Sequence, residues 1–307
     1  MSLALLFPGQ GTQHAQMLPW LEDEPAARPL LHRIAAALGS DWRDRLADPA
    51  WATENAVAQP LLVGIESAAW ACLAGRLPAP AVIAGYSVGE VAAFGAAGVF
   101  DAGTALDLAR VRAEVMARSA GQPTGLMATR DVPLSVIEAW CRRYGLSVAI
   151  RLGPDRAIVG GSAEAMRAAA ADPAMAGARI SDIGVRIASH TPWMRAAAEA
   201  FASHLAAIPV QAPAAALVCN LTGTATRDSA SLARCLSAQI ASPVLWDACM
   251  ETIAERQVGC VLEIGPGTTL ASLWRASYPN VPARSIDEFR SAAAVAGWVA
   301  KVLGGGR

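Results

Sequence analysis

One short segment combines a reactive side chain with a backbone turn that would expose it. The segment from Gly85 to Gly89 reads Gly-Tyr-Ser-Val-Gly; an apolar run precedes it and a helical pattern follows from Glu90 to Ala97. Strand, sharp turn at the serine and helix make up a nucleophile elbow, which lifts the hydroxyl clear of the sheet. Glycines beside the serine let the chain turn without side-chain collisions. We therefore expect Ser87 to be a nucleophile; the alternative is a glycine-rich turn with an incidental serine.

A serine nucleophile needs a proton acceptor, and histidine is the usual one. The chain has four histidines, of which His32 and His204 lie within predicted helices and His14 follows the first strand. His190 stands between an apolar strand and a helix, so it is the candidate base. No aspartate or glutamate stands at an evident strand end between Ser87 and His190. The sequence therefore predicts that another group, such as a backbone carbonyl, orients the imidazole.

Two further segments could assist this chemistry. The loop from Pro8 to Gln13 places glycines on both sides of Gln10, so its amides can point inward, although on this segment alone an ordinary strand-end turn is the favoured interpretation. The predicted helix from Thr104 to Ser119 carries Arg110 and Arg112 about 200° apart, so the two cannot face one pocket. Solvent exposure is the default expectation for each arginine.

Strands and helices alternate through most of the chain, which predicts a mainly parallel sheet covered on both faces. Between residues 123 and 188 the pattern changes to strand, helix, strand, strand, helix, strand, which is typical of a ferredoxin-like unit. We expect an α/β fold with a large domain made of residues 1–122 and 189–307. The ferredoxin-like small domain, 123–188, is inserted between these two parts.

Composition narrows the classes of function. The 307 residues are 54% hydrophobic with a net charge of −1, which suits a large core and gives nucleic-acid binding no electrostatic support. The six cysteines are scattered without a Cys-x-x-Cys pair, which indicates free thiols and no metal site. The N-terminus lacks a basic signal region, and no uninterrupted apolar run approaches the roughly 18 residues of a membrane span. We expect a cytoplasmic protein that does not bind a membrane.

Taken together, these segments resemble the malonyl-CoA:acyl-carrier-protein acyltransferases, from about Leu3 to Leu273. The segments that carry the resemblance are Phe7-Pro8-Gly9-Gln10-Gly11, Gln59-Pro60, Gly85 to Glu90, Arg112, Ser189-His190, Asn220, Gln239, Ser242-Pro243-Val244 with Trp246, and Glu263 to Gly267. Each is modest alone, but the set in this order and spacing is specific. The resemblance implies an α/β-hydrolase-like large domain with an inserted ferredoxin-like one.

The resemblance also implies a role for each site residue. Ser87 would attack the thioester carbonyl of malonyl-CoA, and His190 would take its proton and pass it to the departing thiol. The backbone amides of Gln10 and Val88 would form the oxyanion hole, and the main-chain carbonyl of Gln239 would orient the histidine.

Arg112 would pair with the free carboxylate of the malonyl group and discriminate against acetyl. The family implies an acyl carrier protein as acceptor, malonyl-CoA as substrate, and no bound cofactor or metal.

Two positions depart from the family pattern. Tyr86 stands where the family usually has histidine, and the hairpin at Leu152 lacks the common asparagine. Tyr86 and Asn220 are the expected pocket residues. The form Gly-Tyr-Ser-Val-Gly-Glu most resembles the epsilon subunit of bacterial malonate decarboxylase, whose acceptor is a dedicated delta-type carrier protein. The leading hypothesis is therefore a malonate decarboxylase malonyltransferase.

Three alternatives stay open at this point. The first is a malonyl-CoA:acyl-carrier-protein transacylase of fatty-acid or polyketide synthesis. The second is a serine thioester hydrolase, in which water replaces the acceptor thiol. The third is a non-catalytic docking subunit, which the complete set of Ser87, His190, Arg112 and Gln239 argues against.

Overall fold

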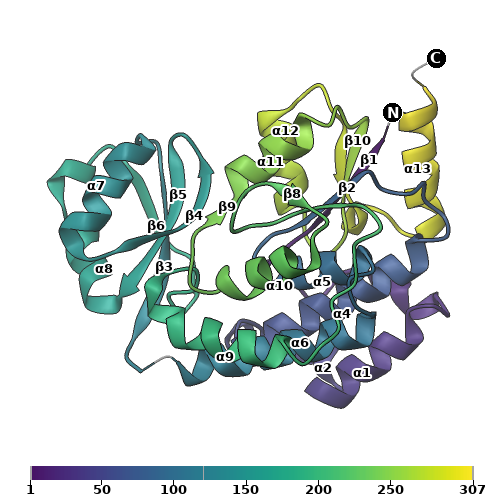
Figure 1. The fold of residues 1–307 in the computed structure, drawn as a ribbon, viewed down its shortest axis with the longest axis horizontal. Coiled ribbons are helices and arrows are strands. Elements are labelled where there is room, and N and C mark those ends of the chain that lie inside the picture. The colour runs from purple at the N-terminus through teal and green to yellow at the C-terminus, as the bar shows by residue number, and fades with distance from the viewer. Residues whose placement is uncertain (1, 120, 306–307) are drawn as a thin grey trace.

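A six-stranded sheet forms the centre of the larger of two units in the computed structural model, which describes residues 2–119 and 121–305 (Figure 1). In spatial order its strands are β11 (Ala283–Ser285), β10 (Cys260–Glu263), β1 (Leu3–Phe7), β2 (Val82–Gly85), β7 (Ala216–Val218) and β8 (Ala225–Thr226). All neighbours are parallel except β7 and β8. The predicted α/β fold with a parallel sheet is confirmed.

The central strands are buried on both faces, as their apolar sequences predict. In β1, Leu3, Leu5 and Phe7 belong to one hydrophobic core, while Ala4 and Leu6 belong to a second core. This alternation follows from the two-residue repeat of a strand. The sheet therefore needs helices on both sides.

Helices cover the two faces unequally. The first core contains residues of α1 (Arg28–Leu38), α2 (Trp42–Arg45), α3 (Pro49–Ala52), α4 (Asn55–Leu73), α5 (Gly89–Ala96), α6 (Ala102–Arg118), α9 (Arg195–Leu205), α10 (Ser229–Ala238) and α13 (Ala292–Gly304). The second core contains residues of α11 (Trp246–Ala254) and α12 (Thr269–Ser277). Short 3₁₀ turns lie at Pro19–Asp23, Pro173–Met175, Pro192–Met194 and Ile286–Glu288. The 3₁₀ turn at Pro192–Met194 leads directly into α9.

Helix α4 has the length and apolar composition of a membrane span, but 83% of its most apolar stretch is buried inside the protein. It packs against α1, α5 and α6. Gln59, Pro60 and Glu66 interrupt its apolar run in the sequence, and all three are buried. Its hydrophobicity is accounted for by its place in the core.

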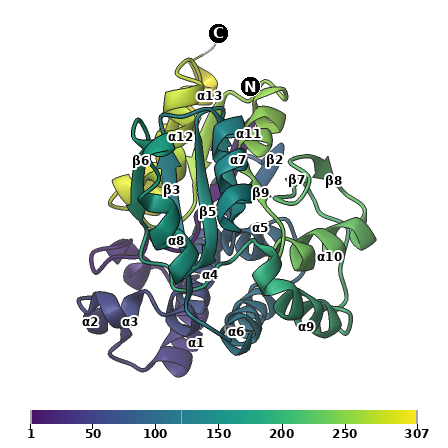
Figure 2. The same cartoon turned by 90° about the vertical axis from the view of Figure 1, so that its left-hand side faces the viewer.

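The smaller unit has its own sheet beside the larger one (Figure 2). Along the chain it contains β3 (Thr124–Arg130), α7 (Leu134–Tyr144), β4 (Ser147–Gly153), β5 (Arg156–Ser162), α8 (Ala163–Ala170) and β6 (Arg179–Asp182). The spatial order is β6-β3-β5-β4-β9, and the first four strands pair antiparallel. The element order agrees with the sequence pattern.

The fifth strand, β9 (Val244–Leu245), was not expected from the sequence because it is only two residues long. It comes from the later part of the chain and pairs parallel with β4, joining Ile150 to Val244 and Arg151 to Leu245. An ion pair between Arg151 and Asp247, at 2.8 Å, lies at the same junction. These contacts attach the smaller sheet to the larger unit.

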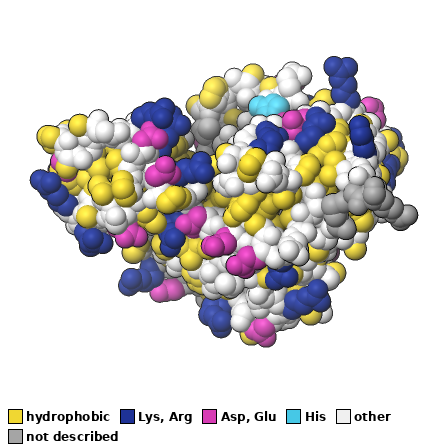
Figure 3. Space-filling view, turned by 90° about the horizontal axis from the view of Figure 1, so that it is seen from above, with side chains coloured by type: hydrophobic (Ala, Val, Ile, Leu, Met, Phe, Trp, Pro, Cys, Tyr) yellow, Lys and Arg dark blue, Asp and Glu magenta, His cyan; other side chains and the backbone are white. Residues whose placement is uncertain are grey.

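The two faces of the smaller sheet have different neighbours. Met127 and Val159 pack with Trp140 of α7 in a core of the smaller unit alone. Leu126 and Ile158 face the other way and join the second core of the larger unit. The surface seen from above shows basic and acidic side chains interspersed, with neither sign gathered in one stripe on that face (Figure 3).

Candidate active site

Ser87 lies in the turn between β2 and α5 with a left-handed backbone, φ 56°. Non-glycine residues rarely adopt this conformation, and it is typical of strained functional turns. The flanking glycines are sterically required. A Cβ at Gly85 would lie 2.2 Å from the backbone of Gly89, and a Cβ at Gly89 would lie 2.2 Å from the carbonyl oxygen of Pro8. The turn therefore has the geometry that the sequence predicts for an elbow.

His190 comes from the segment before α9 and meets Ser87 across the fold. Its Nε2 lies 2.7 Å from the Ser87 Oγ. His190 is 1% exposed, also has a left-handed backbone, and donates its backbone N–H to the carbonyl of Ile240 at 2.9 Å. The serine and histidine that the sequence selected are thus within hydrogen-bond distance.

The other ring nitrogen of His190 fixes the tautomer. Its Nδ1 lies 2.6 Å from the main-chain carbonyl oxygen of Gln239, directly after α10. A carbonyl oxygen only accepts, so Nδ1 carries the hydrogen and donates it. Nε2 then holds a lone pair toward the Ser87 hydroxyl. In a serine triad a carboxylate would accept the hydrogen bond from Nδ1 that the Gln239 carbonyl accepts here.

Burial and the nearby Arg112 charge lower the pKa of His190 to about 3, although the bond to Gln239 opposes the shift. Both causes disfavour the charged imidazolium. The imidazole is therefore neutral across the physiological pH range. Neutral imidazole is the form that can take a proton from a serine.

Two backbone amides flank the serine and donate to no acceptor among the described residues. They are the N–H of Val88, at the N-terminus of α5, and the N–H of Gln10. The Gln10 loop is fixed by side chains: Gln10 Nε2 donates to Thr53 O at 2.9 Å, and Thr12 Oγ1 donates to Gly9 O at 3.0 Å. Free N–H groups at a helix N-terminus suit a developing negative charge.

Asn220 supports the elbow from behind instead of bordering the pocket as expected. Its Oδ1 accepts the Ser87 backbone N–H at 2.8 Å, and its Nδ2 donates to Gly85 O. Glu90 holds Asn220 in turn, because its Oε1 accepts the Asn220 backbone N–H at 2.7 Å. Asn220 is 0% exposed. Asn220 lies behind the elbow because its side-chain amide forms hydrogen bonds with backbone groups on both sides of the turn, the Ser87 N–H and the Gly85 carbonyl.

Arg112 is buried in α6, whereas Arg110 on the same helix is exposed and pairs with Glu114. Arg112 Nη1 donates to Gln59 Oε1 at 2.7 Å, and Nη2 donates to Gln239 Oε1 at 3.4 Å. Its Nε has no partner among the described residues. Burial lowers the pKa of Arg112 to about 10, so the guanidinium is still charged at neutral pH.

A cavity of about 80 Å³ opens at the serine. It is lined by Gln10, Tyr86, Ser87, Leu126, Ile150, Ile158, Ile183, Val185, Ser189 and His190. A second cavity, of about 280 Å³, shares Gln10, Tyr86 and Ile158 with it and adds Leu152. Tyr86 thus lines both cavities, and its ring packs nearly perpendicular to that of Trp246, with the ring centroids 5.2 Å apart. The lining of neither cavity includes Arg112.

The remaining titratable residues singled out in the sequence lie elsewhere. His32 and His204 are exposed, and His14 Nε2 lies 2.6 Å from Asp287. Glu263 caps α12, where it accepts the backbone N–H groups of Leu270 and Ala271. Among the described residues, no group of three or more histidine, cysteine, aspartate or glutamate side chains could hold a metal ion.

Sequence reasoning missed the residues that hold the site residues in place. Gln59, Glu90 and the Asn220 contacts have no signature of their own, because each acts through a partner distant in the chain. All three stood in segments that carried the family resemblance, and that was the signal available in the sequence.

Comparison with known proteins shows which family the chain matches. The model of the family "Acyl transferase domain" matches residues 4–301. The malonyl CoA-acyl carrier protein transacylase of Mycobacterium tuberculosis is 34% identical over 293 residues, which cover 92% of this chain and 96% of that protein. The Escherichia coli K12 protein of the same name is 31% identical over 311 residues, covering 93% and 96%.

Solved structures match over nearly the whole chain. MCAT from Mycobacterium tuberculosis has a TM-score of 0.88 at 33% identity and covers 96% of this chain and 99% of its own. A malonyl-transacylase in complex with a holo type II PKS acyl-carrier protein has a TM-score of 0.90 at 26% identity, with coverage of 97% and 99%.

Asn220→Ala tests the support behind the elbow. The substitution removes an acceptor for the Ser87 N–H and a donor to Gly85 O, so the left-handed turn should relax. We expect a loss of about 1–3 kcal/mol in the free energy of unfolding and a fall of about 10²-fold in the acylation rate of Ser87. Urea unfolding and single-turnover acylation measure the two effects. Asn280→Ala, at an exposed asparagine, is the control and should change neither.

The buried carboxyl of Glu90 predicts a pH dependence of stability. Burial raises the pKa of Glu90 to about 8 from an ordinary 4.5. Between these values the unfolded chain has lost the proton that the folded protein keeps, so stability falls as pH rises. One such group contributes up to about 1.4 kcal/mol per pH unit.

Glu90→Gln removes this titration and keeps an acceptor for the Asn220 N–H. Urea unfolding from about pH 5.5 to about pH 7.5 should therefore show a flatter decline than the parent protein. Glu263, with a pKa raised to about 7 by burial, accounts for part of the slope that is left. Glu114→Gln, at an exposed position, should leave the slope unchanged. An unchanged slope in Glu90→Gln would mean that Glu90 is ionised in the folded protein.

Proposed function

The chain belongs to the acyl transferase family, and from this premise we propose that it transfers malonyl from malonyl-CoA to the thiol of an acyl carrier protein. The observation that carries the proposal is the 2.7 Å contact between Ser87 Oγ and a neutral His190 Nε2, beside two free backbone amides. Relatives that align with nearly the whole chain are named malonyl CoA-acyl carrier protein transacylases, and these names indicate malonyl-CoA as the substrate.

In the first half-reaction Ser87 Oγ attacks the thioester carbonyl of malonyl-CoA while His190 Nε2 takes the hydroxyl proton. The amides of Gln10 and Val88 hold the oxyanion, where losing one such donor typically costs about 10²–10³ in rate. As the carbonyl re-forms, the carbon–sulfur bond breaks and the CoA sulfur takes the proton from His190. The product is a malonyl ester on Ser87.

The second half-reaction runs the same steps with the carrier thiol as nucleophile. His190 takes the thiol proton, the sulfur attacks the ester carbonyl, and Ser87 leaves with the proton from His190. The Gln239 carbonyl stabilises the imidazolium in both halves, because it accepts the Nδ1–H throughout. All these steps use groups of this chain and its substrates, so no bound cofactor is required.

Arg112 binds the malonyl carboxylate in this proposal. It is charged and buried, and its Nε–H has no partner among the described residues. Hydrogen bonds from a charged group in a dry site are worth about 1.5–3 kcal/mol. An acetyl group would leave the arginine without this partner. Arg112 does not line the cavity as described, so the carboxylate must displace one of the glutamine contacts to reach it.

The domain assignment supports this arrangement. We propose that residues 123–188 form a ferredoxin-like domain inserted between the two parts of the large domain, 1–122 and 189–307. The strand order β6-β3-β5-β4 and a separate hydrophobic core support it. The inserted domain supplies the apolar wall of the catalytic cavity through Leu126, Ile150 and Ile158.

The acceptor is a carrier protein of fatty-acid or polyketide synthesis rather than the delta-type carrier of malonate decarboxylase. The predicted closeness to the malonate decarboxylase epsilon subunit finds no support in the comparisons, since relatives at 34% and 31% identity are transacylases by name. A carrier-bound malonyl-transacylase of similar fold supports the same acceptor class. We also place the protein in the cytoplasm, which its six free, buried cysteines support.

The covalent intermediate gives the first test. Protein incubated with malonyl-CoA labelled in the malonyl group should retain the label, and Ser87→Ala should retain none. Holo carrier protein should then remove the label from the parent protein as malonyl-carrier. Label retained by Ser87→Ala would refute the mechanism. Loss of malonyl-CoA at the same rate without a carrier would indicate a hydrolase. Loading of a delta-type carrier alone would support the malonate decarboxylase hypothesis instead.

Arg112→Ala tests the substrate carboxylate site. We expect malonyl transfer to fall by about 10–10²-fold, the equivalent of about 1.5–3 kcal/mol, while acetyl transfer is retained or rises. The ratio of the two kcat/KM values is the measurement, because a general loss of folding lowers both. Arg110→Ala on the exposed face of the same helix is the matched control. An unchanged preference for malonyl would exclude Arg112 as the carboxylate partner.

A further inference from the structure

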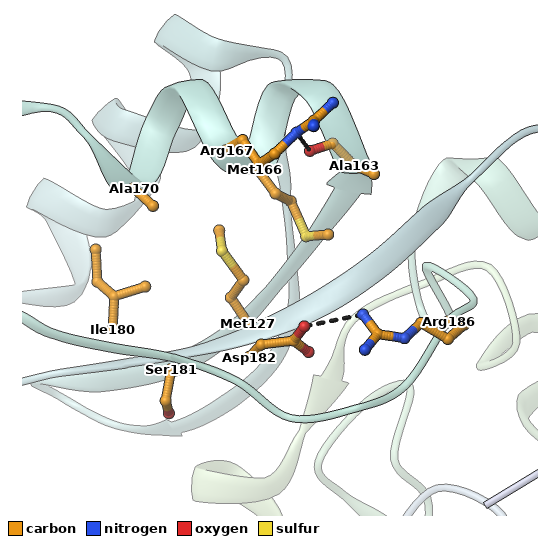
Figure 4. Close-up of a pocket in the computed structure, with 9 residues that line it drawn as sticks. All are labelled: Met127, Ala163, Met166, Arg167, Ala170, Ile180, Ser181, Asp182 and Arg186. Atoms are coloured by element: carbon orange, nitrogen blue, oxygen red, sulfur yellow. Dashed lines mark hydrogen bonds and ion pairs between the residues drawn. The ribbon is translucent and has the colours of Figure 1, made fainter. Parts of the chain in front are cut away.

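A cavity that shares no lining residue with the one at Ser87 opens in the smaller unit. Its volume is about 550 Å³, within the range of roughly 300–1,000 Å³ typical of small-molecule sites. It is larger than the cavity of about 80 Å³ at Ser87 and the neighbouring one of about 280 Å³. It lies between α8 and β6 (Figure 4). Met127 of β3 faces this cavity, whereas its neighbour Leu126 lines the cavity at Ser87 on the other side of the sheet.

The cavity has an apolar end and a charged end. One wall is a single face of α8, because Ala163, Arg167 and Ala170 are spaced by one or two helical turns. Ala170 and Ile180 lie at one end, with Met127 between them and the charged end (Figure 4).

Methionines dominate the middle of the cavity. Met127 comes from β3 and Met166 from α8, and both point into the open space (Figure 4). Methionine side chains are flexible and adapt to apolar ligands of varied shape. The Met166 side chain reaches the sheet at Gly125, because its Cε would lie only 2.9 Å from a Cβ at that glycine.

The charged end carries an excess of positive charge. Arg186 Nη1 pairs with Asp182 at 2.9 Å, and both are solvent-exposed. Arg167 has no carboxylate partner among the described residues; its Nε donates only to the carbonyl of Ala163, at 3.3 Å. Two of the lining side chains are therefore cationic and one is anionic, and the N–H donors of a guanidinium match the geometry of an incoming carboxylate.

We propose that this cavity binds an aliphatic carboxylate of medium chain length. The chain lies over Met127, Met166 and Ile180, and the carboxylate meets Arg167 and Arg186. The wall from Ala163 to Ala170 spans about 10 Å along the helix, which sets the length of chain that the apolar end can cover. An apolar body with one anionic end is the shape and charge that the two ends of the cavity complement.

Strand β3 and the segment from Asp182 to Arg186 line both this cavity and the catalytic one. Met127 faces the α8 side while its neighbour Leu126 lines the cavity at Ser87. Asp182 and Arg186 line the outer cavity, while Ile183 and Val185, between them in the chain, line the catalytic cavity. One layer of backbone thus separates the two. Binding at the outer cavity shifts the catalytic wall and changes the rate of acyl transfer, a consequence that rests on the proposed function.

The binding claim is tested on the full-length protein by isothermal titration calorimetry with decanoate. We expect one saturable site, with decanol bound at least about tenfold more weakly because it lacks the charge. Arg167→Gln should weaken decanoate binding by about tenfold, and Ala170→Trp should abolish it by filling the apolar end from an exposed position. Arg142→Gln, at an exposed arginine of α7, is the matched control and should bind as the parent does.

Three results would overturn the binding claim. These are the absence of saturable binding, equal binding of decanol, and decanoate binding that survives both Arg167→Gln and Ala170→Trp. The last would place decanoate in the catalytic cleft or elsewhere. If the two variants instead alter only the KM for carrier protein, the groove is a carrier-docking surface and the claim fails.

A kinetic experiment tests whether binding in the outer cavity changes the catalytic wall. Decanoate should change the malonyl-transfer rate of the parent protein and leave that of Ala170→Trp unchanged. An unchanged rate in the parent, with binding intact, overturns the link. Calorimetry requires no acyl transfer, so failure of the proposed function is distinguishable from failure of the binding claim.

Discussion

The left-handed backbone at Ser87 is the constraint on which the rest of the site depends. Such a conformation costs about 1–3 kcal/mol and persists only where its surroundings hold it. Here Asn220 bonds the backbone on both sides of the turn, and Glu90 holds Asn220. The loop at Pro8 packs so closely on Gly89 that no Cβ fits between them. Relaxing the turn would therefore move the serine and the oxyanion loop together.

Gln239 joins the three functional groups. Its main-chain oxygen accepts from His190 Nδ1, its side-chain oxygen accepts from Arg112, and its side-chain amide donates to the Ser87 carbonyl at 3.2 Å. One residue thus replaces the carboxylate of a serine triad and also links the nucleophile to the arginine. An orienting carbonyl is uncharged, so it raises the pKa of His190 less than a carboxylate would, and burial with Arg112 nearby keeps the imidazole neutral.

The smaller unit determines the shape of the space at Ser87. Its sheet turns Leu126, Ile150 and Ile158 toward the serine, and Tyr86 lines both the cavity there and a larger one beside it. The unit is attached through the two-residue strand β9 and the Arg151–Asp247 ion pair. A small displacement of this attachment would alter the apolar wall without touching Ser87. Substrate fit and chemistry are therefore carried by different parts of the chain.

The sequence by itself determined the elements and the reactive pair. Strand and helix patterns are local, as is the glycine spacing around Ser87, and the lack of a carboxylate before His190 already indicated that another group takes its place. Only the tertiary structure decided that Arg112 is buried and that Asn220 lies behind the elbow. Local periodicity tells which helix face a residue shares, but burial depends on what packs there from distant segments. Contacts such as Asn220 to Ser87, 133 residues apart, leave no local pattern to read.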